Sequence, residues 1–484
     1  MQYHIGIDIG TSAVKVIAFD ANGAVIARVS KNYPLLQPQP GYSEQDPDAI
    51  CTAVMTGLQE VLQQRSPAAP QFIAFSAAMH SLIVLDQDDR PLTACITWAD
   101  QRASKIATAL QHTDTGRSFY ERTGVPVHSM SPFCKILWLK AHMPELFSKA
   151  ARFIGIKEYV LHKCSGRFLT DSSVAAATGL MNGHTLQWDD EILRYAGVRT
   201  AQLSEVVSAS HAIPSQKVSA IPLLPAGTPL YMGASDGACA TIGSGVRDTA
   251  TMSVTVGTSG AARMLVKGFQ PDTEMRTFCY HVKEDDYIAG GATNNGAIVL
   301  DWLRDQLLHR ENDRDTLMKD AAAVPTGADG LLFLPYLLGE RAPYWNADAR
   351  AVYFGLTLRH RSAHLVRAAM EGVCRAVYST GRILMQRYPV REIHASGGFT
   401  NNDHWVQMMS DHFNLPVVTG VSPDASARGA ILLAVPDAMT CEVLRNGRRF
   451  EPSATDHRIY LAQAEKAARL YELLKAEMPE TDNG

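Results

Sequence analysis

The amino-acid sequence predicts an α/β protein built from two related domains. Three observations support this prediction: the chain has 484 residues, strand-like and helix-like segments alternate, and one strand–turn–strand pattern occurs twice. A chain of this length exceeds what one hydrophobic core usually supports, so we expect two domains of about 200–250 residues each. The stretch 219–250 is rich in proline, glycine, alanine and serine, which indicates that the chain passes from the first domain to the second there. The predicted domains are 1–243 and 244–484.

The repeated pattern is a Gly-Thr-Ser turn between two strands. The first copy is Gly10-Thr11-Ser12, with strands expected over 3–9 and 13–19. The second copy is Gly257-Thr258-Ser259, about half the chain later, with strands expected over 251–256 and 261–266. A repeat this long indicates a duplicated domain and not a solenoid. Chance is the alternative interpretation, because the tripeptide is short.

The other elements follow from local signals. Asn22-Gly23 predicts a hairpin turn into a third strand, and Asp46-Pro47 predicts a helix start before apolar residues at helical spacing. The segment 72–77 reads as a buried strand, and 393–396 as the counterpart of 73–76. In the second half we expect helices over 297–308, 362–385 (capped by Ser362), 404–413, 426–435 and 461–478.

Composition and charge exclude several classes of protein. Apolar residues make up 46% of the chain, charged residues 19%, and the net charge is −4, so we expect a globular protein without a nucleic-acid partner. No secretory signal and no apolar run of the ~18 residues that a transmembrane helix needs are found, so we expect a cytoplasmic protein without a membrane partner. The eight scattered cysteines form no Cys-x-x-Cys pair, which favours reduced core thiols.

The first turn has residues suited to phosphate and metal. Glycine lets a phosphate approach the backbone, and the N–H groups and hydroxyls of Gly10-Thr11-Ser12 can donate to it. Asp8 could hold Mg²⁺, directly or through water, and Lys15 is a nearby cation. The equivalent positions of the second copy are Thr255 and Ala262, which leaves a neutral phosphate cradle. The alternative is an ordinary hairpin turn.

Two segments have open interpretations from the residues alone. Gly397-Gly398, followed by Asn402, comes between a strand and a helix and could contact a base or ribose, or be a plain turn. Asp236 precedes a short helix. It could be a general base for phosphoryl transfer, but from the residues alone an N-cap is favoured.

A polyol site is suggested by an aromatic, a carboxylate and a guanidinium within five residues: Trp98, Asp100 and Arg102. The alternative is that Asp100 caps a helix starting near Gln101. Without further help, His80 after Met79 reads as structural, and Lys157 as a solvated surface lysine.

Several motifs, in order, resemble the FGGY family of carbohydrate kinases over nearly the whole chain. They are Asp8-Ile9-Gly10-Thr11-Ser12 with Lys15, the segment 130–139 (with Ala141 where a polar residue is expected), Thr170-Asp171-Ser172-Ser173, the segments 339–343, 355–356 and 364–372, and Gly397-Gly398. The resemblance implies two actin/hexokinase-like (ribonuclease H-like) domains with an interdomain cleft. It implies sugar on the first domain, and ATP mainly on the second.

The same resemblance implies roles for individual residues. Asp236 matches the catalytic base, which replaces the cap interpretation, and with Asp8 it would hold Mg²⁺. The sugar pocket would be lined by Met79, His80, Trp98, Asp100 and Met130. The implied ATP site comprises Gly10, Thr11, Ser12, Lys15, Gly257, Thr258, Gly397, Gly398 and Asn402.

Within the family, four segments look most similar to gluconokinases: 75–82, 96–102, 155–159 and 294–300. Ser81 and Ala99 stand where xylulokinases more often have Gly and Asn. We therefore expect ATP-dependent phosphorylation of gluconate, with His80, Arg102 and Lys157 as candidate partners of its carboxylate. The alternatives are a xylulokinase or other ketose or polyol kinase of the same family, or a non-catalytic actin-like ATP-dependent interaction protein. A homodimer is left open.

Overall fold

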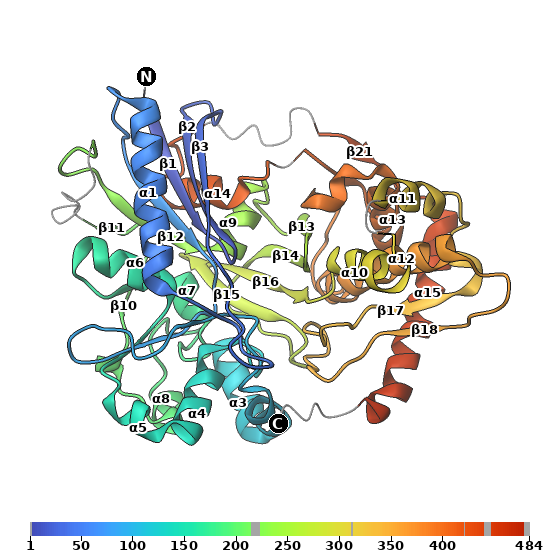
Figure 1. Ribbon diagram of the computed structural model, residues 1–484, viewed down its shortest axis with the longest axis horizontal. Helices are drawn as coiled ribbons and strands as arrows, with labels where there is room; N and C mark the ends of the chain where they lie inside the picture. The colour runs from blue at the N-terminus through green and yellow to red at the C-terminus, as the bar shows by residue number, and fades with distance from the viewer. Residues whose placement is uncertain (1, 214–222, 311–312, 421, 440–446, 479–484) are drawn as a thin grey trace. The chain divides into compact units, whose positions relative to one another are not determined.

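A computed structural model gives the structure, and it describes residues 2–213, 223–310, 313–420, 422–439 and 447–478 (Figure 1). The chain divides into two compact units. The first comprises residues 1–245, 266–288 and 424–443, and the second comprises 246–265, 289–423 and 444–484. The boundary at 243/244 stays a prediction. The structure adds that two later segments belong with the first unit.

The first unit is built on a six-stranded sheet with the order β11-β12-β5-β1-β2-β3. The first three strands form an antiparallel meander, in which Gly23 takes the positive φ that the predicted Asn-Gly turn requires. β5 runs parallel to β1, and β12 runs parallel to β5. The strands are β1 (Tyr3–Ile9), β2 (Ala13–Asp20), β3 (Val25–Asn32), β5 (Ile73–Ala77), β11 (Ala212–Ile213) and β12 (Leu230–Ser235).

Helix α1 (Pro47–Arg65) packs against β2 and β3, as its apolar spacing predicts. Asp46 is its N-cap and accepts from the N–H groups of Asp48 and Ala49 at 2.9 and 3.3 Å. The predicted inner face is buried: Ile50, Val54, Leu58, Val61 and Leu62. The cap and the apolar face together confirm the predicted helix.

The first unit contains further helices and short strands. The helices are α2 (Ser104–Gln111), α3 (Asp114–Thr123), α4 (Pro132–His142), α5 (Pro144–Lys149), α6 (Ile156–Ser165), α7 (Ser172–Ala176), α8 (Asp190–Ala196), α9 (Asp236–Gly243) and α14 (Ala425–Ala434). The strands are β4 (Glu44–Gln45), β6 (Ile83–Leu85), β7 (Cys95–Ile96), β8 (Arg152–Ile154), β9 (Leu169–Asp171), β10 (Glu205–Val207) and β15 (Phe278–Lys283). Among the described residues, the cysteines form no disulfide.

Helix α14 belongs to the first unit, although sequence order places it in the second half. It packs on α9, β5 and β1, and glycines make the approach close. A Cβ at Gly429 would lie 1.8 Å from the carbonyl oxygen of Cys239, and one at Gly6 would lie 2.4 Å from that of Ala427. The helix therefore touches backbone on both sides, a contact that no local pattern predicts.

The second unit repeats the strand order of the first. Its strands are ordered β16-β14-β13-β19-β20-β21, so β16-β14-β13-β19-β20 corresponds to β3-β2-β1-β5-β12. β14 is antiparallel to β13, and β19 is parallel to β13, as β2 and β5 are to β1. The shared order supports the predicted duplication. The strands are β13 (Thr251–Val256), β14 (Gly260–Lys267), β16 (Asp286–Thr293), β19 (Glu392–Ser396), β20 (Val417–Val418) and β21 (Arg449–Phe450).

The helices of the second unit differ from expectation at their ends. The predicted helix 297–308 is α10 (Ile298–Trp302) followed by a π-helical turn (Leu303–Leu307). Arg361, and not Ser362, is the N-cap of α12 (Ser362–Met385). α15 (Ala454–Leu474) begins seven residues earlier than predicted, because Ser453 caps it. The remaining elements are α11 (Arg314–Ala322), α13 (Asp403–Phe413), β17 (Leu332–Leu334) and β18 (Val352–Phe354). Across the described residues, no helix combines the length and apolarity needed to span a membrane.

Candidate active site

Asp8 lies at the carboxyl end of β1, between two partners that the sheet register fixes. It is directly opposite Lys15 on β2 and Ser76 on β5. The Ser76 hydroxyl donates to Asp8 Oδ1 at 2.8 Å. The carboxylate is therefore oriented by the sheet, and most of the residue is buried, with some of its surface left accessible.

A second carboxylate, that of Asp236, acts on Asp8. Burial and then the Asp236 charge raise the pKa of Asp8 to about 6, while Ser76 and Lys15 oppose the shift. A cation bound between two carboxylates that repel each other would relieve this repulsion, so the pair favours cation binding. Their hard oxygen ligands suit Mg²⁺. Among the residues described, no cluster of three or more His, Cys, Asp or Glu side chains forms a metal site.

Asp236 is the first residue of α9, directly after β12. The N-cap is Ser235, whose hydroxyl accepts from the N–H of Ala238 at 3.4 Å. The interpretation of Asp236 as a plain N-cap is therefore wrong. Its own Oδ1 accepts from the N–H of Gly237 at 2.7 Å, which fixes the carboxylate at the positive end of the helix.

The first Gly-Thr-Ser turn is held by side chains from three other segments. Trp98 Nε1 donates to Thr11 Oγ1 at 2.9 Å, and Gln45 Nε2 donates to the Thr11 carbonyl at 2.5 Å. The Tyr33 hydroxyl donates to the Gly10 carbonyl at 2.5 Å. Ser12 stays exposed. The structure thus brings a predicted sugar-site residue, Trp98, to the predicted phosphate turn, and adds two holders that sequence reasoning missed.

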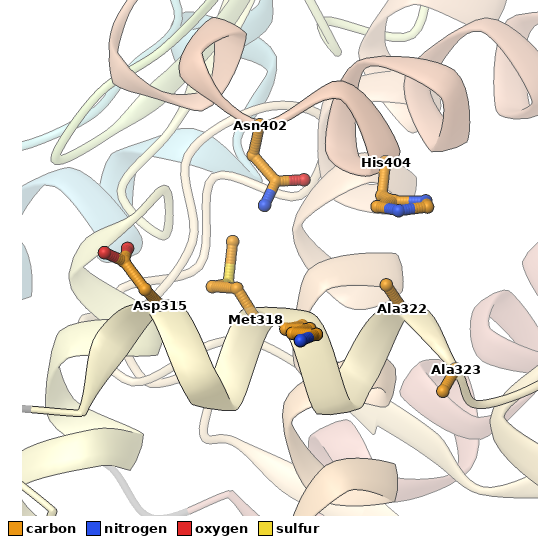
Figure 2. Close-up of a pocket in the computed structure, with 7 residues that line it drawn as sticks. Asp315, Met318, Ala322, Ala323, Asn402 and His404 are labelled. Carbon is orange, nitrogen blue, oxygen red and sulfur yellow. The ribbon is translucent and has the colours of Figure 1, made fainter.

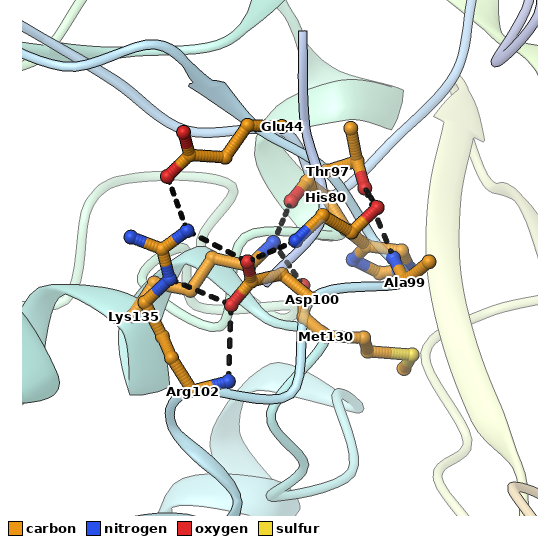
Figure 3. A network of polar contacts seen from close by, with 9 residues as sticks. Glu44, His80, Thr97, Ala99, Asp100, Arg102, Met130 and Lys135 are labelled. Carbon is orange, nitrogen blue, oxygen red and sulfur yellow. Dashed lines mark hydrogen bonds and ion pairs between the residues drawn. The ribbon is translucent and has the colours of Figure 1, made fainter. Parts of the chain in front are cut away.

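Asp100 and Arg102 are engaged with each other (Figure 3). Asp100 Oδ1 accepts from the backbone N–H and Nε of Arg102, and Oδ2 accepts from Arg102 Nη2 and the N–H of Ser43, all at 2.7–3.0 Å. These four bonds fill the lone-pair positions of a carboxylate that is only 1% exposed. Helix α2 starts at Ser104 with Ala103 as N-cap, so the expected helix cap at Asp100 is wrong.

The Arg102 guanidinium also donates to Glu44 at 2.5 Å and lies 3.9 Å from the centre of the Tyr42 ring.

Lys157, expected at the surface, is 2% exposed. Its ammonium donates to Asp171 Oδ2 at 2.7 Å and to the Ala234 carbonyl at 3.1 Å. Both cations are thus paired with carboxylates of the protein, which weakens them as partners of a substrate carboxylate.

His80 is held in an unusual backbone conformation. Its φ of 67° lies in the left-handed region, and its Nδ1 is 2.8 Å from the Ala177 carbonyl. The ring packs edge-on to Tyr280, with centroids 5.8 Å apart. Among the other predicted pocket residues, Met130 is buried and Met79 is half-buried.

The second Gly-Thr-Ser turn lies under a backbone segment. The N–H of Gly296 donates to the Thr258 carbonyl at 3.1 Å, and that of Ala297 donates to the Gly257 carbonyl at 2.7 Å. A Cβ at Gly296 would lie 2.5 Å from the Gly257 carbonyl oxygen, so glycine is needed there. The Thr258 side chain is exposed, and a Cβ at Gly257 would meet nothing within 4 Å. This turn therefore has a fixed backbone and an open face.

Gly397 lies beside the strand that leads into the second turn. With φ of 97°, it approaches Val256 so closely that a Cβ would be 2.4 Å from the Val256 carbonyl oxygen. Gly398 is exposed, and a Cβ there would meet nothing within 4 Å. The two glycines therefore expose backbone next to the turn, as a nucleotide contact requires.

Asn402 borders a cavity of about 420 Å³. Its Oδ1 accepts from the N–H of Trp405 at 2.9 Å, which makes it the N-cap of α13. Figure 2 shows Asn402 and His404 facing helix α11, from which Met318 and Ala322 extend. The lining is completed by Asp315, Lys319 and Ala323. The volume falls within the range of small-molecule sites, about 300–1,000 Å³.

Family comparisons identify the class of protein. The models described as "FGGY family of carbohydrate kinases", N-terminal domain and C-terminal domain, match residues 3–243 and 252–437. The chain belongs to the FGGY family of carbohydrate kinases, so the resemblance drawn from its motifs is confirmed. It is an enzyme, a sugar kinase of a family that uses ATP as phosphate donor. The expectation of an enzyme is thereby confirmed, and the alternative of a non-catalytic interaction protein is set aside.

Individual relatives agree with this membership. The chain is 41% identical to a gluconokinase of Bacillus licheniformis over 90% of this chain and 87% of the relative. It is 33% identical to a xylulose kinase of Bacillus subtilis over 90% and 88%. A solved gluconate kinase structure from Lactobacillus acidophilus matches with a TM-score of 0.93 and 34% identity, covering 99% of both chains. The predicted two-domain kinase fold is confirmed.

Proposed function

We propose that this enzyme transfers the terminal phosphoryl group of Mg-ATP to D-gluconate, giving 6-phospho-D-gluconate. The observation that carries the proposal is the difference in sequence identity: 41% and 40% to two gluconokinases, against 33% to a xylulose kinase. Overall structural similarity does not discriminate, since solved structures named gluconate kinase and xylulose kinase, both from Lactobacillus acidophilus, match with the same TM-score of 0.93. A ketose substrate such as xylulose is the second candidate.

In the proposed reaction, Asp236 accepts the proton of the terminal sugar hydroxyl. The oxygen of that hydroxyl forms a bond to the γ-phosphorus, and the bond from phosphorus to the β,γ-bridging oxygen breaks. The Gly237 N–H at 2.7 Å and the start of α9 stabilise the Asp236 carboxylate, so it remains a base before the transfer.

Asp8 and Asp236 would hold Mg²⁺ on the first unit. When bound, the ion would neutralise charge on the phosphates of ATP. Burial and the Asp236 charge raise the pKa of Asp8 to about 6, so Asp8 is ionised and able to bind a cation at neutral pH. Below pH 6 a proton competes with the cation for this carboxylate.

The nucleotide would be bound by backbone groups. Gly10, Thr11, Ser12 and Lys15 contact the transferring phosphate, and Gly257 and Thr258 contact the other phosphates. Gly397, Gly398 and Asn402 contact the adenosine, with the 420 Å³ cavity receiving its base. The open faces at Gly257 and Gly398 support this assignment, because a phosphate or ribose can reach the backbone there.

The sugar would lie against Met79, His80, Trp98 and Met130. Asp100 and Arg102 would support this pocket without binding the sugar through their charges, because those charges are already paired within the protein. We propose His80 as a contact of the gluconate carboxylate, with Arg102 and Lys157 as weaker candidates because they pair with Asp100, Glu44 and Asp171.

The test is a substrate panel of gluconate, D-xylulose, L-ribulose and glycerol, with coupled detection of ADP. We expect the highest kcat/KM with gluconate, and a product with the phosphate on C6 by nuclear magnetic resonance. A higher kcat/KM with D-xylulose would overturn the gluconate assignment and favour the second candidate.

A further inference from the structure

Lys135 is a buried cation that the proposed mechanism does not use. It lies on α4 with 0% exposure, although lysine is seldom fully buried. Its ammonium donates to the carbonyl of His80 at 2.5 Å and to the carbonyl of Met130 at 2.9 Å. Figure 3 shows the side chain reaching between these two residues. Removing an ammonium from water is costly, so its hydrogen bonds have to serve the fold or the site.

The bond to His80 supports a strained backbone. A positive φ of 67° is uncommon for a residue with a Cβ, and such conformations persist where surrounding contacts hold them. Lys135 holds the carbonyl of His80, while the Ala177 carbonyl lies 2.8 Å from His80 Nδ1 on the side chain. The direction of the imidazole is thus fixed from both the backbone and the ring.

The bond to Met130 fixes the second wall of the same pocket. Met130 directly precedes Ser131, the N-cap of α4, whose hydroxyl accepts from the N–H of Cys134 at 3.2 Å. Since Lys135 is on the same helix, its bond to the Met130 carbonyl closes a loop back onto the start of that helix. One ammonium group therefore ties a segment after β5 to a segment before α4.

The surroundings of Lys135 indicate that it holds these two backbone segments and does not bind the substrate directly. Burial lowers the pKa of Lys135 to about 7, while the Asp100 charge opposes this shift and the Arg102 charge adds to it. Asp100 is already saturated by Arg102 and Ser43. The neutral amine still has two N–H groups, so the bonds to both carbonyls can persist in either protonation state.

We propose that Lys135 is a positioning residue of the sugar pocket: it fixes the backbones of His80 and Met130 relative to each other and thereby sets affinity for the sugar. This inference rests on the proposed assignment of His80 and Met130 to the sugar. Lys135 does not touch the substrate in this account.

The test substitutes Lys135→Met, which keeps the length of the side chain and removes the donors. We expect kcat/KM for the sugar to fall by about tenfold or more, because small misplacements of binding groups are costly, with KM for ATP changed by less than about twofold. The matched control is Lys140→Met on the same helix, where the lysine is exposed and donates to the Tyr195 carbonyl at 3.1 Å. The control should keep both constants.

Combination with His80→Ala separates positioning from general stability. If Lys135 acts mainly through His80, the double variant loses little more sugar kcat/KM than His80→Ala alone. A folded Lys135→Met variant with unchanged sugar kcat/KM would overturn the inference, as would equal losses for sugar and ATP. If Lys135→Met does not fold, Lys135→Gln is judged by the same criteria.

Failure of the proposed substrate is distinguishable from failure of this inference. If the wild type prefers another sugar of the panel, the gluconate assignment fails, and the Lys135 variants are measured with that sugar. If the single variant His80→Ala leaves sugar KM unchanged, the assignment of His80 to the pocket fails, and the inference about Lys135 fails with it.

Discussion

The two Gly-Thr-Ser turns have the same architecture and different chemistry. In each unit the turn follows a central strand whose last polar residue bonds to a serine on the parallel neighbour. In the first unit Ser76 donates to Asp8 at 2.8 Å, and in the second the hydroxyls of Thr255 and Ser396 are 2.8 Å apart. Both units therefore have the hydrogen bond between the two neighbouring strands, but only the first unit has a carboxylate at this position.

Strand pairing shows a further difference that the sequence offset hides. By offset, Ala262 corresponds to Lys15, but the sheet register places Ala261 opposite Thr255, whereas Lys15 is opposite Asp8. The second turn is thus one residue tighter and has no charge at either position. Under the proposed mechanism, both turns would supply backbone groups for the phosphates, and only the first would add the charged side chains that catalysis needs.

The largest effect is expected at the base. Asp236→Asn removes the proton acceptor without changing the size of the side chain, so kcat should fall by about 10²–10⁴-fold. Binding of ATP in the absence of Mg²⁺, measured by calorimetry, should change little, because the proposed direct contacts to the nucleotide lie on other residues. If turnover stayed near the wild-type rate, Asp236 would not be the base, and the chemistry would not belong to the first copy.

A substitution at the second turn should impair ATP binding, in contrast to Asp236→Asn, which should impair turnover. Gly296→Ala puts a Cβ 2.5 Å from the Gly257 carbonyl oxygen, so the turn has to shift. We expect KM for ATP to rise by about tenfold or more, with a smaller change in KM for the sugar. Steady-state kinetics with each substrate varied checks this. A selective rise in sugar KM would contradict the assignment of this turn to the nucleotide.

Asp8→Asn should raise the free energy of unfolding and, at the same time, lower the rate of sugar phosphorylation. The folded-state pKa of Asp8, about 6, lies above its usual 3.8, so folding favours the protonated form, and ionisation lowers stability as pH rises from about 4 to 6. At pH 7.5 and without Mg²⁺, we expect a gain of about 1–3 kcal/mol in the free energy of unfolding. Below pH 4 the gain should disappear. Urea titrations at both pH values decide this, and a loss of stability at pH 7.5 would contradict it.

The smallest effect is expected at the neutral counterpart. Thr255→Val removes one hydroxyl bond and should cost about 0.5–1.5 kcal/mol. Because Thr255 is uncharged, this cost should be the same at pH 4 and pH 7.5, in contrast to Asp8→Asn. Urea titrations check the pair. A pH-dependent cost would mean that a titrating group near Thr255 interacts with its hydroxyl.

Much of the fold follows from local signals in the sequence. The bounds of β1 and β13 match their predictions, because turn residues end both strands and apolar residues alternate along each of them. Helix ends were less predictable. Ser362 is a good capping residue, yet Arg361 takes that place, since the cap depends on where the chain enters the helix.

The partners of charged residues could not be predicted. Asp100 is saturated partly by Ser43, which is 57 residues away in the chain, and Lys135 bonds to a carbonyl 55 residues away. Nothing in the local sequence of Lys157 distinguishes a surface lysine from one paired with Asp171. The predicted roles of the site residues therefore remain proposals, although the motifs that contain them identify the family.

The central claim is that only the first copy is equipped for the metal. The most direct measurement is the rate of sugar phosphorylation as a function of Mg²⁺ concentration for wild type, Asp8→Asn and Thr255→Val. We predict that Asp8→Asn raises the half-saturating Mg²⁺ concentration by about tenfold or more, and that Thr255→Val leaves it unchanged. Equal Mg²⁺ dependence in all three proteins would contradict the account.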